Sequence, residues 1–153
     1  MTKKVLLILG AILIIIQFFR PEKNTSPQLI TEEDISKSVT IPDDLHQTFI
    51  KKCYDCHSNQ TKYPWYFNIQ PVAWWLSYHV NEGKDELNFS AFKTYDQKKA
   101  THKLEEIGEM IEEGEMPLKS YTLIHTDTKI TPDDKQAINA WLASLNIDFK
   151  KEH

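Results

Sequence analysis

Hydrophobic and polar residues divide the chain into three parts. Val5–Phe19 is a nearly continuous apolar run that directly follows Lys3 and Lys4. Residues 21–40 are polar, contain two prolines and show no sustained period, which predicts a flexible tether. Over residues 41–148 apolar positions recur at helical spacing, which predicts a single all-α domain.

The periodic part predicts four helices. Their ranges are about 42–53, 71–81, 96–113 and 132–145. Glycine just after a helix favours its termination, so Gly83 is expected to stop the second helix and Gly114 the third. Thr131 and Asp134 have the spacing of a capping box at the start of the fourth.

Two intervening segments are expected to be irregular. Leu87–Phe92 alternates apolar and polar residues, and a packed loop is favoured over a strand because the neighbours are helical. Residues 115–121 show no periodicity and predict no regular element.

The apolar run at the start has the length at which signal peptides and short membrane anchors overlap. Its 15 residues would span about 22 Å as a helix, against about 30 Å for the hydrocarbon core of a bilayer. Phe18-Phe19-Arg20-Pro21 offers no small-residue cleavage site, so residues 1–20 are expected to be an uncleaved anchor, with a cleaved signal peptide as the alternative. The positive flank predicts that the remainder lies outside the inner membrane, in the periplasm.

Charge separates the two ends of the chain. Three of the 18 basic residues and none of the 22 acidic ones lie in residues 1–20, so the remainder carries a net charge near −7. A field of this sign opposes binding to nucleic acid and favours a partner protein with a basic docking surface.

Cys53-Tyr54-Asp55-Cys56-His57 is the motif that carries the chemistry. Thiols at i and i+3 lie on one helical face and can bond the two vinyl groups of a haem, and the imidazole at i+4 can reach the iron from the same face. Zinc would need further ligands, a redox C-x-x-C would need a βαβ setting, and a disulfide at this spacing would stabilise little. The motif therefore predicts covalent attachment of one haem c.

An aromatic block over residues 64–79 follows the motif closely. It contains three of the four tryptophans, and we expect Trp65 and Trp74 to pack against the haem, with core filling as the alternative. Arg20 is the only arginine, so haem propionates would have to be met by other donors, for which Lys62, Tyr63 and Trp65 are candidates.

Three residues compete for the second axial position on the iron. Met116 lies in a glycine-bounded loop before Pro117, which suits a thioether presented by irregular backbone. His79 and His125 would instead give a bis-histidine site with a lower reduction potential. Met110 lies within a predicted helix and fits the role of core filler. Met116 is the expected iron ligand after His57, and His79 is the next choice.

With these residues in view, the chain resembles class I c-type cytochromes, and more closely the small single-haem proteins known as haem-binding domain proteins. The resemblance covers Ile41 to Leu145 and rests on the segments CYDCHSN, YPWY, IQPVAWW, HVNEGKDELNFSAF, EEGEMPLKSYTLIH and DDKQAINAWL. It implies an all-α, cytochrome c-like domain wrapped around one covalent haem. It further implies that Cys53, Cys56 and His57 bind the haem and that Met116 is the distal ligand. It implies no substrate.

These observations lead to three functional hypotheses. The first is a membrane-tethered periplasmic electron carrier with His/Met ligation, acting on redox partner proteins and not as an enzyme. The second is a haem-based enzyme or sensor with an open or displaceable distal position. The third is a haem-containing accessory subunit of a membrane redox complex.

Overall fold

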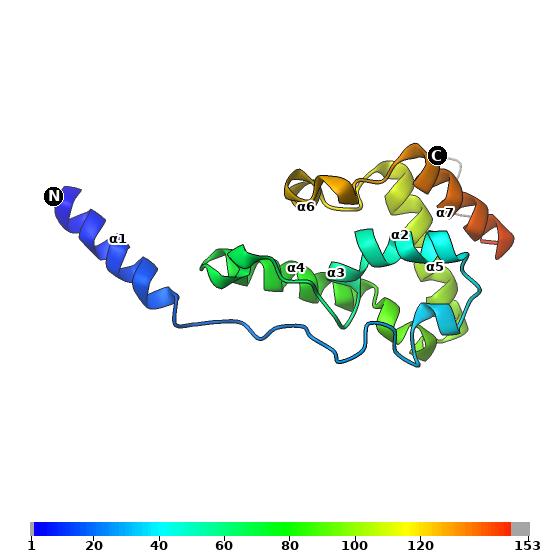
Figure 1. Cartoon of the computed structure of the whole chain (residues 1–153), viewed down its shortest axis with the longest axis horizontal. Coiled ribbons are helices and arrows are strands. Elements are labelled where there is room, and N and C mark those ends of the chain that lie inside the picture. Colours follow the sequence, from blue (N-terminus) through cyan, green and yellow to red (C-terminus); the bar gives the residue numbers. More distant parts are fainter. Residues whose placement is uncertain (1, 148–153) are drawn as a thin grey trace.

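The computed structural model describes residues 2–147, and within that range the chain forms helices but no strand (Figure 1). This confirms the all-α prediction. The elements are α1 (Thr2–Ile16), η1 (Ile35–Lys37), α2 (Asp43–Lys52), α3 (Tyr54–His57), η2 (Trp65–Asn68), α4 (Val72–Glu86), η3 (Phe89–Thr94), α5 (Gln97–Glu113), α6 (Lys119–Ile124), η4 (Thr126–Thr128) and α7 (Pro132–Ser144), where η marks 3₁₀ turns.

Helix α1 projects from one end of a helical body formed by the other elements (Figure 1). In the body, α2 packs against α3 and α7, α3 packs against α4, and α5 packs against α7. The core lies where α2, η3 and α7 meet: the ring of Phe49 stacks on Phe89 at 5.6 Å and meets Trp141 edge-on at 5.4 Å. The indole N–H of Trp141 donates to the carbonyl of Thr40 at 2.9 Å, so the only polar atom of this buried ring has a partner.

The predicted ends of α5 and α7 are confirmed. Gly114 adopts the left-handed conformation (φ 71°) directly after α5. Thr131 and Asp134 form the capping box at the start of α7, each side chain bonding the backbone N–H of the other. Both signals are local, because each depends on residues no more than four positions apart.

The expected end of α4 is wrong, because the helix continues through Gly83 to Glu86. A Cβ atom at Gly83 would lie 2.9 Å from the carbonyl oxygen of Cys56 and 3.2 Å from its Cβ. This glycine therefore allows α4 to approach α3 closely, and it does not act as a stop signal.

We expect Gly83→Ala to destabilise the protein despite the better helix propensity of alanine. The contact is with backbone, so overpacking costs about 1–3 kcal/mol and exceeds the propensity gain of about 1 kcal/mol. Thermal unfolding of haem-loaded protein should show a lower Tm. Gly10→Ala is the matched control, since a Cβ there meets nothing within 4 Å. An equal or higher Tm for Gly83→Ala would show that α3 and α4 can separate without cost.

Residues 21–40, which the sequence predicts to be a flexible tether, are here called the strap and are hydrogen-bonded to the body. The side-chain amide of Asn24 donates to the carbonyl of Ser58 at 2.8 Å and to the hydroxyl of Thr61 at 3.0 Å. Its side-chain oxygen accepts from Lys84 at 2.7 Å, and its backbone carbonyl accepts from the Thr61 N–H at 3.0 Å. One asparagine thus joins the strap to both the loop after α3 and the end of α4.

A second attachment lies further along the strap. Asp34 and Ile35 are fully buried, and the hydroxyl of Tyr54 donates to the Asp34 carboxylate at 3.0 Å. The same carboxylate caps η1 by accepting from the backbone N–H of Ser36 at 2.9 Å. The strap therefore contributes to the core beside the haem-attachment motif.

Two segments expected to be irregular contain helical turns. Residues 89–94 form η3, where Asn88 caps the first turn by accepting from the N–H of Ser90. Helix α6 begins at Lys119, inside the segment predicted to have no element. Among the described residues, no helix combines the length and apolar character needed to cross a bilayer.

Candidate haem site

The C-x-x-C-H motif lies at the junction of α2 and α3. Cys53 ends α2 and precedes α3, and its carbonyl accepts from the backbone N–H of Cys56 at 3.2 Å and of His57 at 3.0 Å. This single turn brings Cys53, Cys56 and His57 together along the wall of a cavity of about 490 Å³. The sequence spacing predicted this shared placement, and the structure agrees with it.

His57 is held in the orientation that a ligand needs. Its Nδ1–H donates to the backbone carbonyl of Leu87 at 3.0 Å, which leaves Nε2 as the acceptor nitrogen. Burial lowers the pKa of His57, so the imidazole is neutral. A neutral ring with a fixed tautomer is the form that binds iron.

The two cysteines are free thiols with little tendency to ionise. Burial, assisted by the neighbouring Cys56, raises the pKa of Cys53 to about 12. Burial, assisted by Asp55, raises the pKa of Cys56 to about 11. The described residues contain no group of three or more His, Cys, Asp or Glu side chains that could hold a metal ion.

The lining of the cavity is largely apolar. It includes Phe49 and Lys52 of α2, Leu87 just after α4 and Phe89 of η3, and most of its remaining residues come from three regions. From α4 come His79, Glu82, Gly83 and Glu86; from α5, Lys103, Glu106, Ile107, Glu109, Met110 and Ile111; from the segment before α6 and from α6 itself, Met116, Pro117, Leu118 and Tyr121. Met116 is therefore in the same cavity as His57, although 59 positions separate them in the chain.

The other candidates for the iron divide between cavity and surface. His79 lines the cavity, as does Met110, which the sequence suggested was filler. His125 is not among the lining residues, and its Nε2 bonds the hydroxyl of Tyr66 at 2.8 Å. Of the three residues that the sequence offered as second ligand, Met116 and His79 line the cavity and His125 does not.

The predicted aromatic contacts are not at the cavity. Trp65 is 75% exposed and Trp74 is 41% exposed, and neither lines it. Lys62 and Tyr63 are also outside the lining, and the Tyr63 hydroxyl accepts from the backbone N–H of Asn24 at 2.8 Å. From α4 the cavity takes His79, Glu82, Gly83 and Glu86, which lie further along the helix than Trp74.

Two cavity-lining groups were missed by the sequence analysis. The hydroxyl of Tyr121 donates to the carboxylate of Asp55, inside the motif, at 2.7 Å. Burial and the adjacent Asp55 raise the pKa of Tyr121, so the hydroxyl keeps its proton. Lys103 pairs with Glu86 at 3.3 Å and Glu106 at 2.6 Å on the cavity rim. Since 66 residues separate Tyr121 from Asp55, no local pattern indicates the pair.

The cavity residues fit a haem. A volume of about 490 Å³ lies within the range of about 300–1,000 Å³ typical of small-molecule sites, and the lining is mostly apolar. Thiols at i and i+3 stand beside a neutral, oriented histidine, which is the donor set that a covalently attached haem requires. Fold and site together define an all-helical haem-binding protein.

The comparison with protein families agrees. The chain belongs to the haem-binding domain family, whose model matches residues 11–144. The match begins well before Ile41, so the family's domain includes the strap. This agrees with the structure, in which the strap contributes buried residues to the core. Neither a curated protein nor a solved structure gives a match to this chain.

Proposed function

We propose that this haem-binding protein is a membrane-attached c-type electron carrier in the periplasm, with one haem bonded to Cys53 and Cys56. The observation that carries the proposal is the shared cavity, which holds both thiols, His57 and Met116. His57 and Met116 are the proposed axial ligands. Bound there, the haem iron would supply one-electron chemistry by changing between its ferric and ferrous states.

The chain's own residues suit electron transfer more than substrate chemistry. Ile107, Ile111 and Leu118 give the cavity apolar walls, and the carbonyl of Leu87 accepts a hydrogen bond that holds the His57 ring in one orientation. A pair of fixed protein ligands changes little in geometry with oxidation state. The proposed role is therefore that of a carrier and not an enzyme, and the acidic surface favours redox partners that present a basic docking face.

The alternative of a sensor or enzyme has one observation in its favour. His79 and Met116 both line the cavity, so one of them could replace the other or leave the iron open. Carbon monoxide distinguishes the cases, because it binds ferrous iron only where a position is free or easily vacated. An unchanged spectrum under carbon monoxide supports the carrier, and copurification of a larger complex would indicate an accessory subunit.

Covalent attachment is tested by acid–organic extraction of the purified full-length protein. We expect the haem to stay with the polypeptide, one per chain by mass, and reversible voltammetry to show a single one-electron wave. Extraction that strips the haem would refute the attachment at Cys53 and Cys56. More than one haem per chain would contradict the single site.

Tyr121 is expected to position Met116 through its bond to Asp55. Tyr121→Phe removes a hydrogen bond to a charged group, worth about 1.5 kcal/mol at a half-buried site, and frees the start of α6. We expect a weaker methionine–iron charge-transfer band and measurable carbon monoxide binding.

Tyr78→Phe is the control for that substitution, because Tyr78 is an exposed tyrosine of α4 that does not line the cavity. It should leave both spectra unchanged. If Tyr121→Phe lowers the Tm yet alters neither the band nor carbon monoxide binding, Tyr121 only stabilises the fold.

A further inference from the structure

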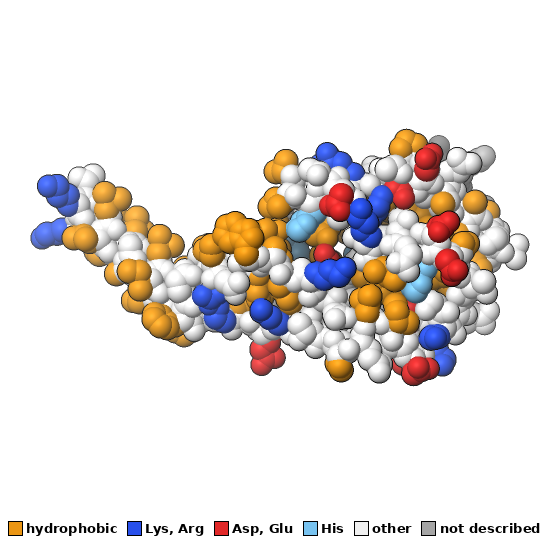
Figure 2. Space-filling view, in the orientation of Figure 1, with side chains coloured by type: hydrophobic (Ala, Val, Ile, Leu, Met, Phe, Trp, Pro, Cys, Tyr) orange, Lys and Arg blue, Asp and Glu red, His pale blue; other side chains and the backbone are white. Residues whose placement is uncertain are grey.

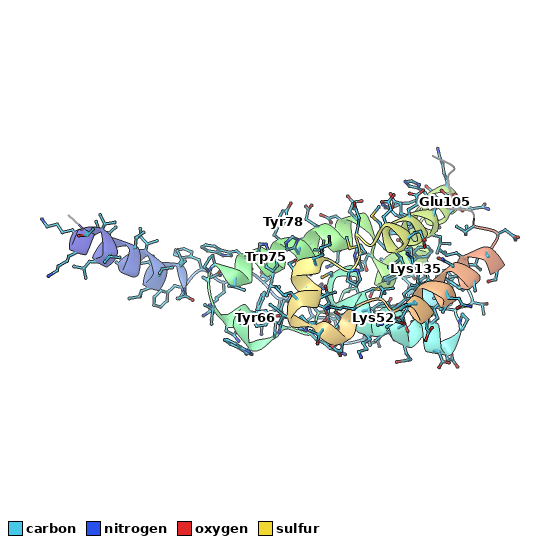
Figure 3. All side chains as sticks on the ribbon, turned by 90° about the horizontal axis from the view of Figure 1, so that it is seen from above. Lys52, Tyr66, Trp75, Tyr78, Glu105 and Lys135 are labelled. Carbon is cyan, nitrogen blue, oxygen red and sulfur yellow. The ribbon has the colours of Figure 1, made fainter. Side chains whose placement is uncertain are left out.

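The end of the body nearest α1 carries large exposed apolar side chains from η2 and α4. This surface, here called the apolar end, consists of Trp65, Ile69, Val72, Trp74, Trp75 and Tyr78. Trp65 is 75% and Tyr78 58% exposed. Figure 3 shows Tyr66, Trp75 and Tyr78 toward α1, with Lys52, Glu105 and Lys135 toward the opposite end of the molecule.

Helix α1 continues this apolar surface. None of its residues is buried, and its aliphatic side chains, such as Leu7 at 74%, are open on all sides. Phe18 and Phe19, just after the helix, are 82% and 63% exposed. Figure 2 shows hydrophobic side chains along α1 and gathered over the neighbouring end of the body, whereas the visible acidic side chains lie mainly over the other end.

Hydrogen bonds fix α1 to the apolar end. Gln70 lies just before α4 and is only 2% exposed. Its backbone N–H donates to the side-chain oxygen of Gln17 at 2.9 Å. Its backbone carbonyl accepts from the side-chain amide of Gln17 at 3.2 Å. The side-chain amide of Gln70 donates to the carbonyl of Phe19 at 2.6 Å. The strap then continues to Asn24, which is bonded to the body at several points. No flexible linker therefore separates the apolar segment from the domain.

We propose that the apolar end lies in the headgroup interface of the lipid bilayer into which α1 inserts, so that the haem cavity is held in one orientation to the membrane. The inference rests on the membrane attachment proposed above. Tryptophan and tyrosine favour the interface because each has an apolar body and a polar tip. Arg20 and Lys23 lie four and seven positions after the end of α1, and basic side chains near an apolar segment favour contact with lipid phosphates.

A bilayer explains this surface better than a protein partner does. The apolar end and α1 form one continuous apolar surface, and the Gln17–Gln70 bonds prevent one part from entering a membrane while the other stays far from it. Glu106, a carboxylate at the cavity rim, lies on α5 and so belongs to a different element from η2 and α4, which carry the apolar end.

The test is the depth of nitroxide labels on full-length, haem-loaded protein in phosphatidylcholine vesicles. Cys53 and Cys56 are consumed by the haem, so Trp65→Cys, Tyr78→Cys and Lys98→Cys each provide one labelling site. Lys98 is an exposed residue of α5 and serves as the control. The iron is kept reduced, and collision of each label with oxygen and with a water-soluble nickel chelate is measured by electron paramagnetic resonance.

On binding vesicles, labels at positions 65 and 78 should gain access to oxygen and lose access to nickel, while the label at 98 should not change. If the protein binds vesicles but the labels at 65 and 78 stay water-accessible, the inference is overturned and the membrane attachment survives. If the protein does not bind vesicles, both are overturned. Labels that are aqueous in vesicles but shielded from both reagents in native membranes would assign the surface to a protein partner instead.

Discussion

Replacing His57 with alanine is expected to abolish recovery of haem-loaded protein almost completely. Without the imidazole, the apolar cavity of about 490 Å³ would have to form around a haem that lacks its proximal iron ligand. Loss of the ring also removes its hydrogen bond to the carbonyl of Leu87, the residue just after α4, so the cavity wall loses a hydrogen bond as well as a ligand. Binding of a cofactor to the folded state alone contributes directly to folding stability, and this contribution would be lost.

The measurement is haem per polypeptide together with the yield of soluble protein after detergent extraction. His102→Ala is the matched control, since His102 is an exposed histidine on α5 that does not line the cavity, and it should load haem normally. A His57→Ala protein that keeps full haem content and the wild-type spectrum would mean that another side chain is the proximal ligand.

The haem-attachment turn could be predicted from sequence because its geometry is local. Five consecutive residues define it, and backbone bonds from Cys53 to Cys56 and His57 close it without help from distant parts of the chain. The capping box of α7 was predictable for the same reason. The residues that surround the turn could not be predicted in this way, because Tyr121, which bonds Asp55, lies 66 positions away in the chain.

Composition alone does not reveal that the strap is bonded to the body. Polar residues without a period indicate exposure, but Asn24 and Asp34 find partners in the body and are held by them. A buried polar side chain looks the same in sequence as a solvated one, and only the fold supplies its partners. Gly83 is the converse case, where a residue that often ends helices is required inside one by the backbone of Cys56.

The tryptophans of the aromatic block are exposed and do not line the cavity. Tryptophans after a haem motif suggest packing on the porphyrin, yet Trp65, Trp74 and Trp75 are all more than 40% exposed. The cavity is instead lined by smaller aliphatic groups of α5 and by Phe49 and Phe89 of the core. Exposure of tryptophan on this scale is better explained by an interface than by the haem.

Backbone geometry favours Met116 over His79 as the second ligand. The N–H groups of Glu115 and Met116 both donate to the carbonyl of Met110, at 3.0 and 3.3 Å, so the chain turns back sharply after α5. This turn requires the left-handed Gly114 and brings Met116 against the core beside the cavity. His79 comes from the middle of α4. Its ring packs edge-on against Trp75, which does not line the cavity, with 4.5 Å between the ring centroids.

Met116→Ala is therefore expected to abolish the weak far-red methionine–iron charge-transfer band of the oxidised protein and to lower its reduction potential, since a thioether ligand raises the potential of haem iron. The same change should open the iron to carbon monoxide. Met110→Ala is the matched control, because Met110 lines the same cavity from within α5 and should leave the band in place. The contrary outcome has three parts: the wild-type protein lacks the band, Met116→Ala changes neither the spectrum nor the reduction potential, and His79→Ala changes both. In that case the iron is bound by His57 and His79. The protein would then work at a lower potential, as expected for bis-histidine ligation.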